Sequence, residues 1–272
     1  MKQDNPARLI SELKDVCKVR YPFSIVADFH GPEPTDEFIH DLAETLNELM
    51  STDSLEEIAS LCDEINLQPA EAGNLKTLTV SMDLDFDLGG PPFVFDSESG
   101  ILQVGNITWY GDDEDFNPHE AEEDKSKRQN VTISIVDSPL NQQLRALFGK
   151  DSVLGRKWKE LAEQATTEIE QSGLPFQCKK VTIEINPYST LGEVSEQIFI
   201  TDLDLNANAA LATLAHCIKD FRAYPAGTLE LEKEDDKGRI AASNAKWENG
   251  TISVNAYSGS GCVWLEFSKA RS

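Results

Sequence analysis

The feature that most constrains the fold is an alternation of apolar and polar side chains that begins at Thr77. Successive side chains of a β-strand point to opposite faces of a sheet, so a period of two indicates a strand with one buried face. Gly89-Gly90-Pro91-Pro92 ends the alternation, because glycine and proline interrupt strands. The buried face of this long strand would carry Leu78, Val80, Met82, Leu84, Phe86 and Leu88.

Further strands are expected in both halves of the chain. In the first half we expect a strand at 24–29, a hairpin that joins 93–95 to 101–109 through a turn, and a strand at 131–136. Asn249-Gly250 is the dipeptide that type I′ hairpin turns favour, and Ser258-Gly259-Ser260-Gly261 also indicates a hairpin turn. The other strands of the second half are expected at about 181–185, 194–203, 227–233, 239–248, 250–257 and 262–268.

Helical periodicity accounts for much of the remaining apolar sequence. Ser54 followed by Glu57 forms a capping box, and the helix that it would begin presents Cys62 and Ile65 on its apolar side. Together with the strands, these segments predict an α+β fold in which helices pack on antiparallel or mixed sheets. The other helices are expected at 6–18, after the N-cap candidate Thr35, at 152–171, and at 207–221 with its cap within 202–206.

The order of the predicted elements suggests two similar halves. Each half runs helix, Pro-Phe, strand, helix, strand, hairpin and strand, and Pro22-Phe23 has a counterpart in Pro175-Phe176. Identity between the halves is low, and α+β domains can share such an order by chance. Internal duplication and chance similarity therefore both stand as hypotheses. We expect a strongly acidic α+β half at 1–138 and a near-neutral α+β half at 139–272.

Negative charge is concentrated in the first half. Residues 1–138 carry 9 basic and 30 acidic side chains, a net charge of −21, and residues 139–272 carry 15 and 18, a net charge of −3. Between Asp28 and Asp124, Lys76 is the one basic residue against 26 acids. Repulsion among carboxylates opposes folding, and solubility alone would need less charge. We interpret this acidic half as a surface for a basic partner, with solvation alone as the alternative.

The charge and the cysteines also bear on partners and location. A net charge of −24 repels phosphates, so we expect no direct binding of nucleic acid and no contact with an anionic membrane. No apolar run reaches the length of about 18 residues that a membrane span needs, and the N-terminus lacks a signal-peptide pattern. The five cysteines are scattered and lack CxxC spacing, which is typical of reduced cytoplasmic proteins.

The sequence contains no recognisable catalytic or cofactor-binding motif, and no cofactor is expected. The four histidines lack the spacing of metal ligands. Asp83, Asp85 and Asp87 would project from one strand face about 7 Å apart, a spacing that could share a Mg²⁺ or Ca²⁺ ion. Because the solvent face of a strand often carries such residues, they are weak metal candidates.

The function expected from these features is non-enzymatic binding. The acidic half would dock on a basic protein, for example one that binds nucleic acid, and block its site, as inhibitors, immunity proteins and DNA mimics do. One alternative is a chaperone or scaffold that binds through an apolar patch. Another is a divalent-metal-dependent enzyme that uses Asp83, Asp85 and Asp87. The residues expected to contact the partner are Asp112, Asp113, Glu114, Asp115, Glu120, Glu122, Glu123 and Asp124.

Overall fold

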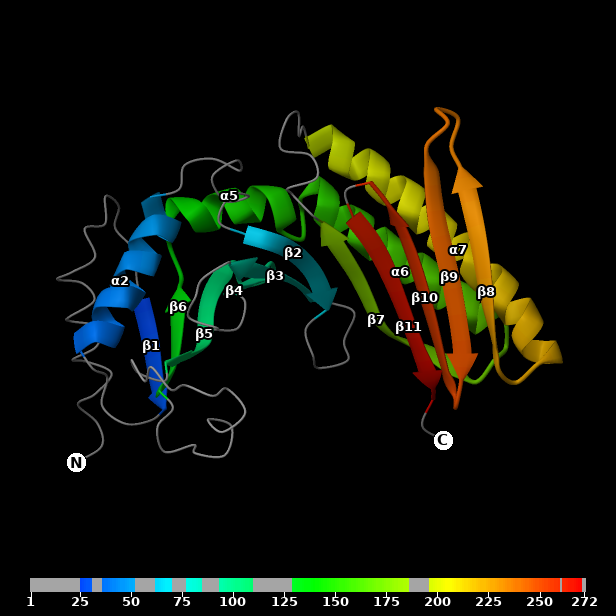
Figure 1. Ribbon diagram of the computed structural model, residues 1–272, viewed down its shortest axis with the longest axis horizontal. Coiled ribbons are helices and arrows are strands. Elements are labelled where there is room, and N and C mark those ends of the chain that lie inside the picture. Colours follow the sequence, from blue (N-terminus) through cyan, green and yellow to red (C-terminus); the bar gives the residue numbers. More distant parts are fainter. Residues whose placement is uncertain are drawn as a thin grey trace, which may run out of the picture. The chain divides into compact units, whose positions relative to one another are not determined.

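The computed structural model describes residues 25–30, 36–51, 62–69, 77–84, 93–109, 129–185, 196–259 and 261–270. The chain divides into two compact units (Figure 1). Unit 1 comprises residues 1–63 and 81–145, and unit 2 comprises residues 64–80 and 146–272. Helices combine with a large amount of antiparallel sheet, which confirms the expected α+β fold. The expected boundary at 138/139 and the internal duplication stay predictions.

Unit 1 contains strands in the order β1-β6-β5-β4. β1 (Ile25–His30) pairs with β6 (Gln129–Ile135), β6 with β5 (Ile101–Trp109), and β5 with β4 (Phe93–Asp96), each pair antiparallel. α2 (Asp36–Ser51) follows β1, as the sequence predicts. The described core of the unit includes Ile39, Leu42, Leu46, Phe95, Leu102 and Ile133.

The turn between β4 and β5 has a specific hydrogen-bonded geometry. The Asp96 carbonyl accepts from the Gly100 amide at 2.7 Å, and the Asp96 carboxylate accepts from the Glu98 amide at 2.9 Å. Gly100 has φ of 68°, a left-handed conformation that glycine adopts without strain. This geometry confirms the turn that the sequence predicts at this position.

A helix that the sequence analysis did not predict, α5 (Pro139–Phe148), begins directly after β6. The Ser138 hydroxyl caps it by accepting from the Asn141 amide at 3.0 Å, and proline suits the first helical position. The Asn141 side chain donates to the Gly100 carbonyl at 3.2 Å, and Arg145 donates to the Ser99 carbonyl at 3.2 Å. The first turns of α5 are therefore fixed to the β4–β5 turn.

Unit 2 has the strand order β2-β7-β11-β10-β9-β8, in which neighbouring strands are antiparallel. From β7 the chain continues through α7 into the successive strands β8 to β11, and β11 returns beside β7. The chain passes from unit 1 to unit 2 within β2, after Asp63, and returns to unit 1 within β3, after Val80. The elements are β2 (Cys62–Pro69), β3 (Leu78–Leu84), α6 (Val153–Gln171), β7 (Phe176–Ile185), α7 (Glu196–Ala223), β8 (Gly227–Glu234), β9 (Ile240–Glu248), β10 (Thr251–Ser258) and β11 (Gly261–Lys269).

α6 and α7 cover one face of the unit 2 sheet (Figure 1). Trp158 on α6 donates its indole N–H to the Val181 carbonyl at 3.1 Å, and Thr213 on α7 is hydrogen-bonded to Ser243 at 2.6 Å. The opposite face, here called the open face, is covered by neither α6 nor α7. The buried strand residues that face the helices include Ile183, Val254, Ala256, Val263 and Leu265.

The strand expected at 194–203 and the cap expected at 202–206 are wrong. The described helix α7 runs without a break from Glu196 to Ala223. Asp204 lies within this helix, and its side chain forms a 2.8 Å ion pair with Lys157 of α6. The long buried face of the helix outweighs the β-propensity of Ile198-Phe199-Ile200. Neither this helix of 28 residues nor any other helix in the described ranges is long and apolar enough to span a membrane. The buried face of α7 includes Leu203, Ala210, Leu214 and Cys217.

The helix expected after Ser54 is wrong at its C-terminal end, where Cys62 and Ile65 lie in strand β2. The register places Ile65 opposite Ile185 and Leu67 opposite Ile183, so β7 satisfies the backbone of this segment. Sheet pairing therefore overrides the helical periodicity at Cys62 and Ile65. Residues 52–61 and the helix expected at 6–18 lie outside the described residues.

The hairpin turns expected in the second half are confirmed. Asn249 and Gly250 have φ values of 50° and 82°, the left-handed conformations that a type I′ turn requires. β10 and β11 form the next hairpin, with Ser258 opposite Gly261. The strands expected at 227–233, 239–248, 250–257 and 262–268 correspond to β8, β9, β10 and β11.

Candidate functional site

The sites expected from the sequence cannot be placed side chain by side chain. The acidic run from Asp112 to Asp124 lies outside the described residues, as do Asp85 and Asp87. Asp83 lies in β3, but its side chain is outside the described part. Within the described ranges, no group of three or more His, Cys, Asp and Glu side chains is arranged to hold a metal ion. Both candidate sites stay predictions.

The acidic character of unit 1 can be followed on α2. The helix has the sequence DEFIHDLAETLNELMS, which contains five acids and no lysine or arginine. Ile39 and Leu42 are buried on one side, and Asp36, His40 and Glu44 are exposed. The described solvent side of this helix therefore presents carboxylates that no basic residue of the same helix neutralises.

A second group of polar side chains gathers on unit 2 around Glu184. The register places Glu184 of β7 directly opposite Cys262 of β11, so both side chains lie on the open face. The Cys262 thiol donates to the Glu184 carboxylate at 3.0 Å, and the Trp264 indole N–H donates to the Cys262 sulfur at 2.8 Å. The thiol therefore has a carboxylate on one side and an N–H donor on the other.

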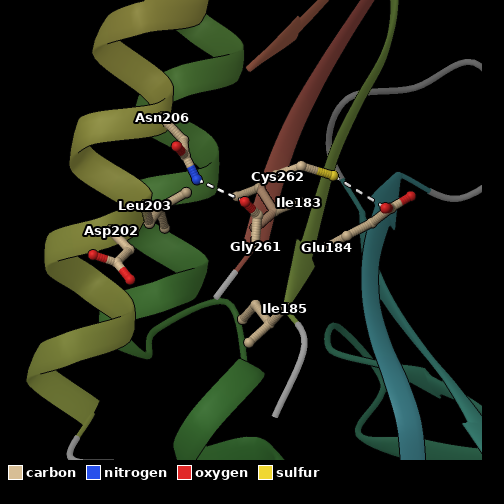
Figure 2. A pocket seen from close by; sticks show the side chains of 8 residues that line it. All are labelled: Ile183, Glu184, Ile185, Asp202, Leu203, Asn206, Gly261 and Cys262. Carbon is tan, nitrogen blue, oxygen red and sulfur yellow. Dashed lines mark hydrogen bonds between the residues drawn. The ribbon is translucent and has the colours of Figure 1, made fainter. Parts of the chain in front are cut away.

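A small pocket lies beside this group, at the ends of β7 and β11 nearest to α7. Figure 2 shows that Leu203 and Asn206 lie on the α7 side of the two strands, whereas the side chains of Glu184 and Cys262 point away from α7, so these two residues line the pocket from the strands without pointing toward the helix. The hollow encloses about 220 Å³, including the space open to solvent. The enclosed part of the hollow has room for no more than about one water molecule, so it is not a cavity for a small-molecule ligand.

Asn206 and Gly261 bring the helix and the strand end together. Asn206 is 2% exposed, and its amide donates to the Gly261 carbonyl at 3.0 Å (Figure 2). A Cβ at position 261 would lie 2.4 Å from the Glu184 carbonyl oxygen, so the close approach of the two strands requires glycine there. The close approach of α7 and the two strands therefore depends on the side-chain amide of Asn206 and on the absence of a side chain at Gly261.

Several buried polar atoms of unit 2 have no hydrogen-bond partner. In the described part of the chain they are the side-chain oxygens of Asn66, Asn206, Asn255 and Ser258. Asn66 lies opposite Glu184, Asn255 opposite Trp264, and Ser258 opposite Gly261, to which Asn206 is bonded. Asn66 and Asn255 therefore lie on the open face, and Asn206 lies on the opposite side of the sheet, so the four atoms do not form one site; each such unpaired group costs roughly 1–3 kcal/mol.

We call the open-face group the Glu184 site and define it by Asn66, Glu184, Cys262 and Trp264. One cation lies beside the pocket on the α7 side, where Arg239 binds Asp202 at 2.7 Å and Asp235 at 2.6 Å. The backbone and side-chain hydrogen bonds from Arg239 lower the pKa of Asp235. Arg239 is therefore already engaged by two carboxylates.

The other described cysteines contrast with Cys262. Burial raises the pKa of Cys178 to about 11 and that of Cys217 to about 12. Both therefore remain thiols at neutral pH and serve as packing residues. The adjacent His216 is exposed and bonded to the Ala212 carbonyl, so it does not pair with Cys217.

The Glu184 site was not predicted from the sequence. Glu184 stands between Ile183 and Ile185, in the alternation that every half-buried strand shows, and nothing local marks it as different. The signal is the register, which joins residues more than 100 positions apart, such as Asn66 and Glu184. Comparison with protein-family models, curated proteins and solved structures gave no match.

Proposed function

We propose that this protein is a non-enzymatic binding protein that docks the acidic surface of unit 1 on a basic protein and blocks that protein's site. In class it would be an inhibitor, an immunity protein or a mimic of nucleic acid. We also propose a cytoplasmic location, because the free cysteines Cys178, Cys217 and Cys262 suit a reducing compartment.

The observation that carries the proposal is the uneven distribution of charge. Between Asp28 and Asp124 the chain has 26 acids and one basic residue, and five of these acids lie on α2, whose own sequence contains no lysine or arginine. Carboxylates gathered in this way repel one another, which opposes folding. A basic partner would relieve that repulsion and would be attracted over about 10 Å at 0.1 M salt.

The proposal is tested by reversing charge at the predicted contact residues. Replacing Asp112, Asp113, Glu122 and Glu123 by lysine should weaken capture of the partner at least about a hundredfold, since rim charges and steering are reversed together. The measurement is a pull-down from host lysate at low salt, eluted by a salt gradient and quantified by mass spectrometry. The wild-type complex should dissociate between about 0.05 and 0.5 M salt.

A matched control applies the same change of charge to unit 2. Glu160, Glu163, Glu168 and Glu170 are exposed on α6, so their replacement by lysine alters net charge equally without touching unit 1. Capture should survive in this control. Equal loss in both variants would mean that net charge alone matters, and capture by the unit 1 variant would contradict the proposed docking surface.

A second candidate function is a chaperone or scaffold that binds through apolar contact. Tyr257 and Ile240 are 51% and 53% exposed, and both lie on the open face of unit 2, beside Ala242. Such a contact would hold as salt rises, and Tyr257→Ser would weaken it while the unit 1 variant would not. The divalent-metal enzyme based on Asp83, Asp85 and Asp87 has no further support from the described residues.

We also propose that the two units arose by internal duplication. The proposal is supported by the order in which the chain connects helices and strands, because each unit runs from a first strand through a helix into successive antiparallel strands. In each unit the last of these strands returns antiparallel beside the first, as β6 does beside β1 and β11 beside β7. An experimental structure in which β1, α2 and β4–β6 fail to superpose on β7, α7 and β9–β11 would contradict it.

A further inference from the structure

We propose that the free edge of β8 in unit 2 binds an extended, basic segment of another protein as an added strand. The free edge is the side of β8 that is turned away from β9, because in the described part of the chain β8 pairs with β9 alone (Figure 1). This goes beyond the docking function proposed for unit 1, since it assigns an interaction surface and a class of partner to the other unit.

The free edge of β8 is long and regular. The 8 residues from Gly227 to Glu234 all pair in register with β9 without a bulge, and the strand contains no proline. Edge strands that must not pair are commonly short, bulged or interrupted by proline. The backbone of β8 has none of these protections, so its shape allows a further strand to pair with it.

The turn that follows β8 shows which backbone groups face the free edge. There the Asp235 amide donates to the Arg239 carbonyl at 2.9 Å, so Asp235 turns its backbone toward the β9 side. In an antiparallel pair, residues that turn toward the partner alternate with residues that turn away from it. Counting back from Asp235, the residues that turn their N–H and C=O groups to the free edge are Glu234, Glu232 and Glu230.

The side chains of β8 form two different rows. Glu230, Glu232 and Glu234 are exposed on the open face. Leu229 and Leu231 are half-buried on the other side, where α7 packs against β8. An added strand extends both rows of a sheet, because its side chains also alternate between the two faces. It would therefore meet carboxylates on the open face and leucines on the α7 side.

The carboxylates of the open-face row are not neutralised by their neighbours. Among the described residues, neither Glu230 nor Glu232 nor Glu234 takes part in an ion pair. Lys246 of β9 lies on the same face but is paired with Glu248 at 2.5 Å. Opposite charges that face each other across two strands stabilise the pairing. Lysine or arginine is therefore the residue type that fits opposite each glutamate, and apolar residues fit the α7 side.

The same row disfavours a second copy of this chain as the occupant. Two copies of β8 that pair antiparallel about a twofold axis would place open-face residues opposite one another. With the axis at Leu231, Glu230 of each copy would lie opposite Glu232 of the other. Like charges directly opposite one another destabilise a pair of strands. The edge thus combines a backbone that can pair with a charge that selects a basic partner.

The test uses a capped peptide of alternating lysine and valine, about as long as β8, added to the full-length protein. Binding is followed by ¹⁵N NMR at about 0.05 M salt, where charge is weakly screened. The backbone amide resonances of β8 should shift with half-saturation at about 10–100 µM. Those of Val181 and Leu265, which are buried in the inner strands β7 and β11, should not shift. Absence of any shift in β8 would overturn the proposal.

Two modified peptides separate strand pairing from attraction between charges. One carries N-methyl groups on its lysines and the other on its valines, so both keep the same side chains and the same charge. An added strand directs one of these sets of N–H groups at β8 and the other set away from it. One peptide should therefore bind at least about tenfold more weakly than the other. Equal affinities would mean that charge alone attracts the peptide, and the proposal would fail.

Amide hydrogen exchange tests whether the edge is free before the peptide is added. In the protein alone, the amides of Glu230 and Glu232 should exchange faster than those of Leu229 and Leu231, which turn toward β9. With the peptide bound, Glu230 and Glu232 should become protected as well. Protection of all four amides without peptide would show that another segment or a second copy already covers the edge, which contradicts the proposal.

The charge requirement is tested by Glu230→Lys combined with Glu232→Lys. The matched control is Glu168→Lys combined with Glu170→Lys, which makes the same change of net charge on the exposed side of α6. The β8 variant should bind the lysine–valine peptide at least about tenfold more weakly, and the control should bind it normally. Equal weakening in both variants would contradict a specific role of β8.

A charge swap completes the test. A peptide of alternating glutamate and valine should bind the β8 lysine variant and not the wild type, because the opposite charges then face each other again. If the lysine variant does not fold, glutamine at both positions removes the charge and keeps the shape, and unchanged binding of the lysine–valine peptide would then overturn the proposal. Failure of the charge-reversal experiment on unit 1 would not affect these results, since the peptide is read out on β8 itself.

Discussion

At the scale of single residues, the environment decides which cysteines can react. Cys217 is buried and Cys178 is partly exposed, and removal from water raises the pKa of Cys178 to about 11 and that of Cys217 to about 12. Cys262 lies on the open face, is partly exposed, and has both a carboxylate at 3.0 Å and an indole N–H at 2.8 Å. Because Cys262 is partly exposed, a reagent can reach its sulfur, whereas Cys217 is buried.

We therefore expect Cys262 to be alkylated at least about tenfold faster than Cys178 and Cys217 at pH 8. A thiol with a pKa of about 11 is ionised in roughly one molecule in a thousand at that pH, and burial also hinders the reagent. The measurement is the rate of iodoacetamide labelling of each cysteine-containing peptide, read by mass spectrometry. Labelling of Cys178 or Cys217 as fast as Cys262 would contradict this description of the site.

At the scale of secondary structure, the sequence predicts elements best where one signal acts alone. The Asn249-Gly250 turn and the alternation in β9, β10 and β11 are local, and the structure has them where they are expected. The errors fall where a local signal competes with pairing or packing. The cap at Ser54 predicts helix, but pairing with β7 makes residues from Cys62 onward a strand.

The same distinction explains why the Glu184 site could not be predicted. A strand pattern shows which residues share a face, but it does not show which strands become neighbours. Asn66 and Glu184 meet because β2 pairs with β7, a pairing that no local feature indicates. An acceptor without a hydrogen bond, such as the side-chain oxygen of Asn66, can be recognised only when all of the groups around it are known.

The N-terminus of α6 provides a test at this scale. The Ser152 hydroxyl accepts from the Gly155 amide at 2.9 Å, so Ser152→Ala should cost about 1 kcal/mol of unfolding free energy. In a protein of this size that lowers the melting temperature by about 2–4 °C in calorimetry. Thr167→Ala, on the exposed side of the same helix, should cause no decrease, because alanine favours helix. A Ser152 variant as stable as wild type would contradict the cap.

At the scale of the whole molecule, the net charge of −24 governs stability as well as binding. Repulsion between carboxylates acts in the folded state and weakens as salt shortens the screening length. The melting temperature should therefore rise by a few degrees between about 0.05 and 0.5 M NaCl, in differential scanning calorimetry. The four-lysine variant of unit 1 should rise less. A wild-type melting temperature that is constant or falls with salt would contradict dominant self-repulsion.

One backbone hydrogen bond in unit 2 joins the two ends of the segment from Pro175 to Ala270. The Ala270 amide donates to the Pro175 carbonyl at 3.0 Å, and Lys269 lies opposite Phe176. The residue that precedes β7, Pro175, and the residue that follows β11, Ala270, are therefore neighbours in space. A segment whose entrance and exit coincide can be inserted into another chain, joined into a circle or repeated in tandem without stretching either neighbour.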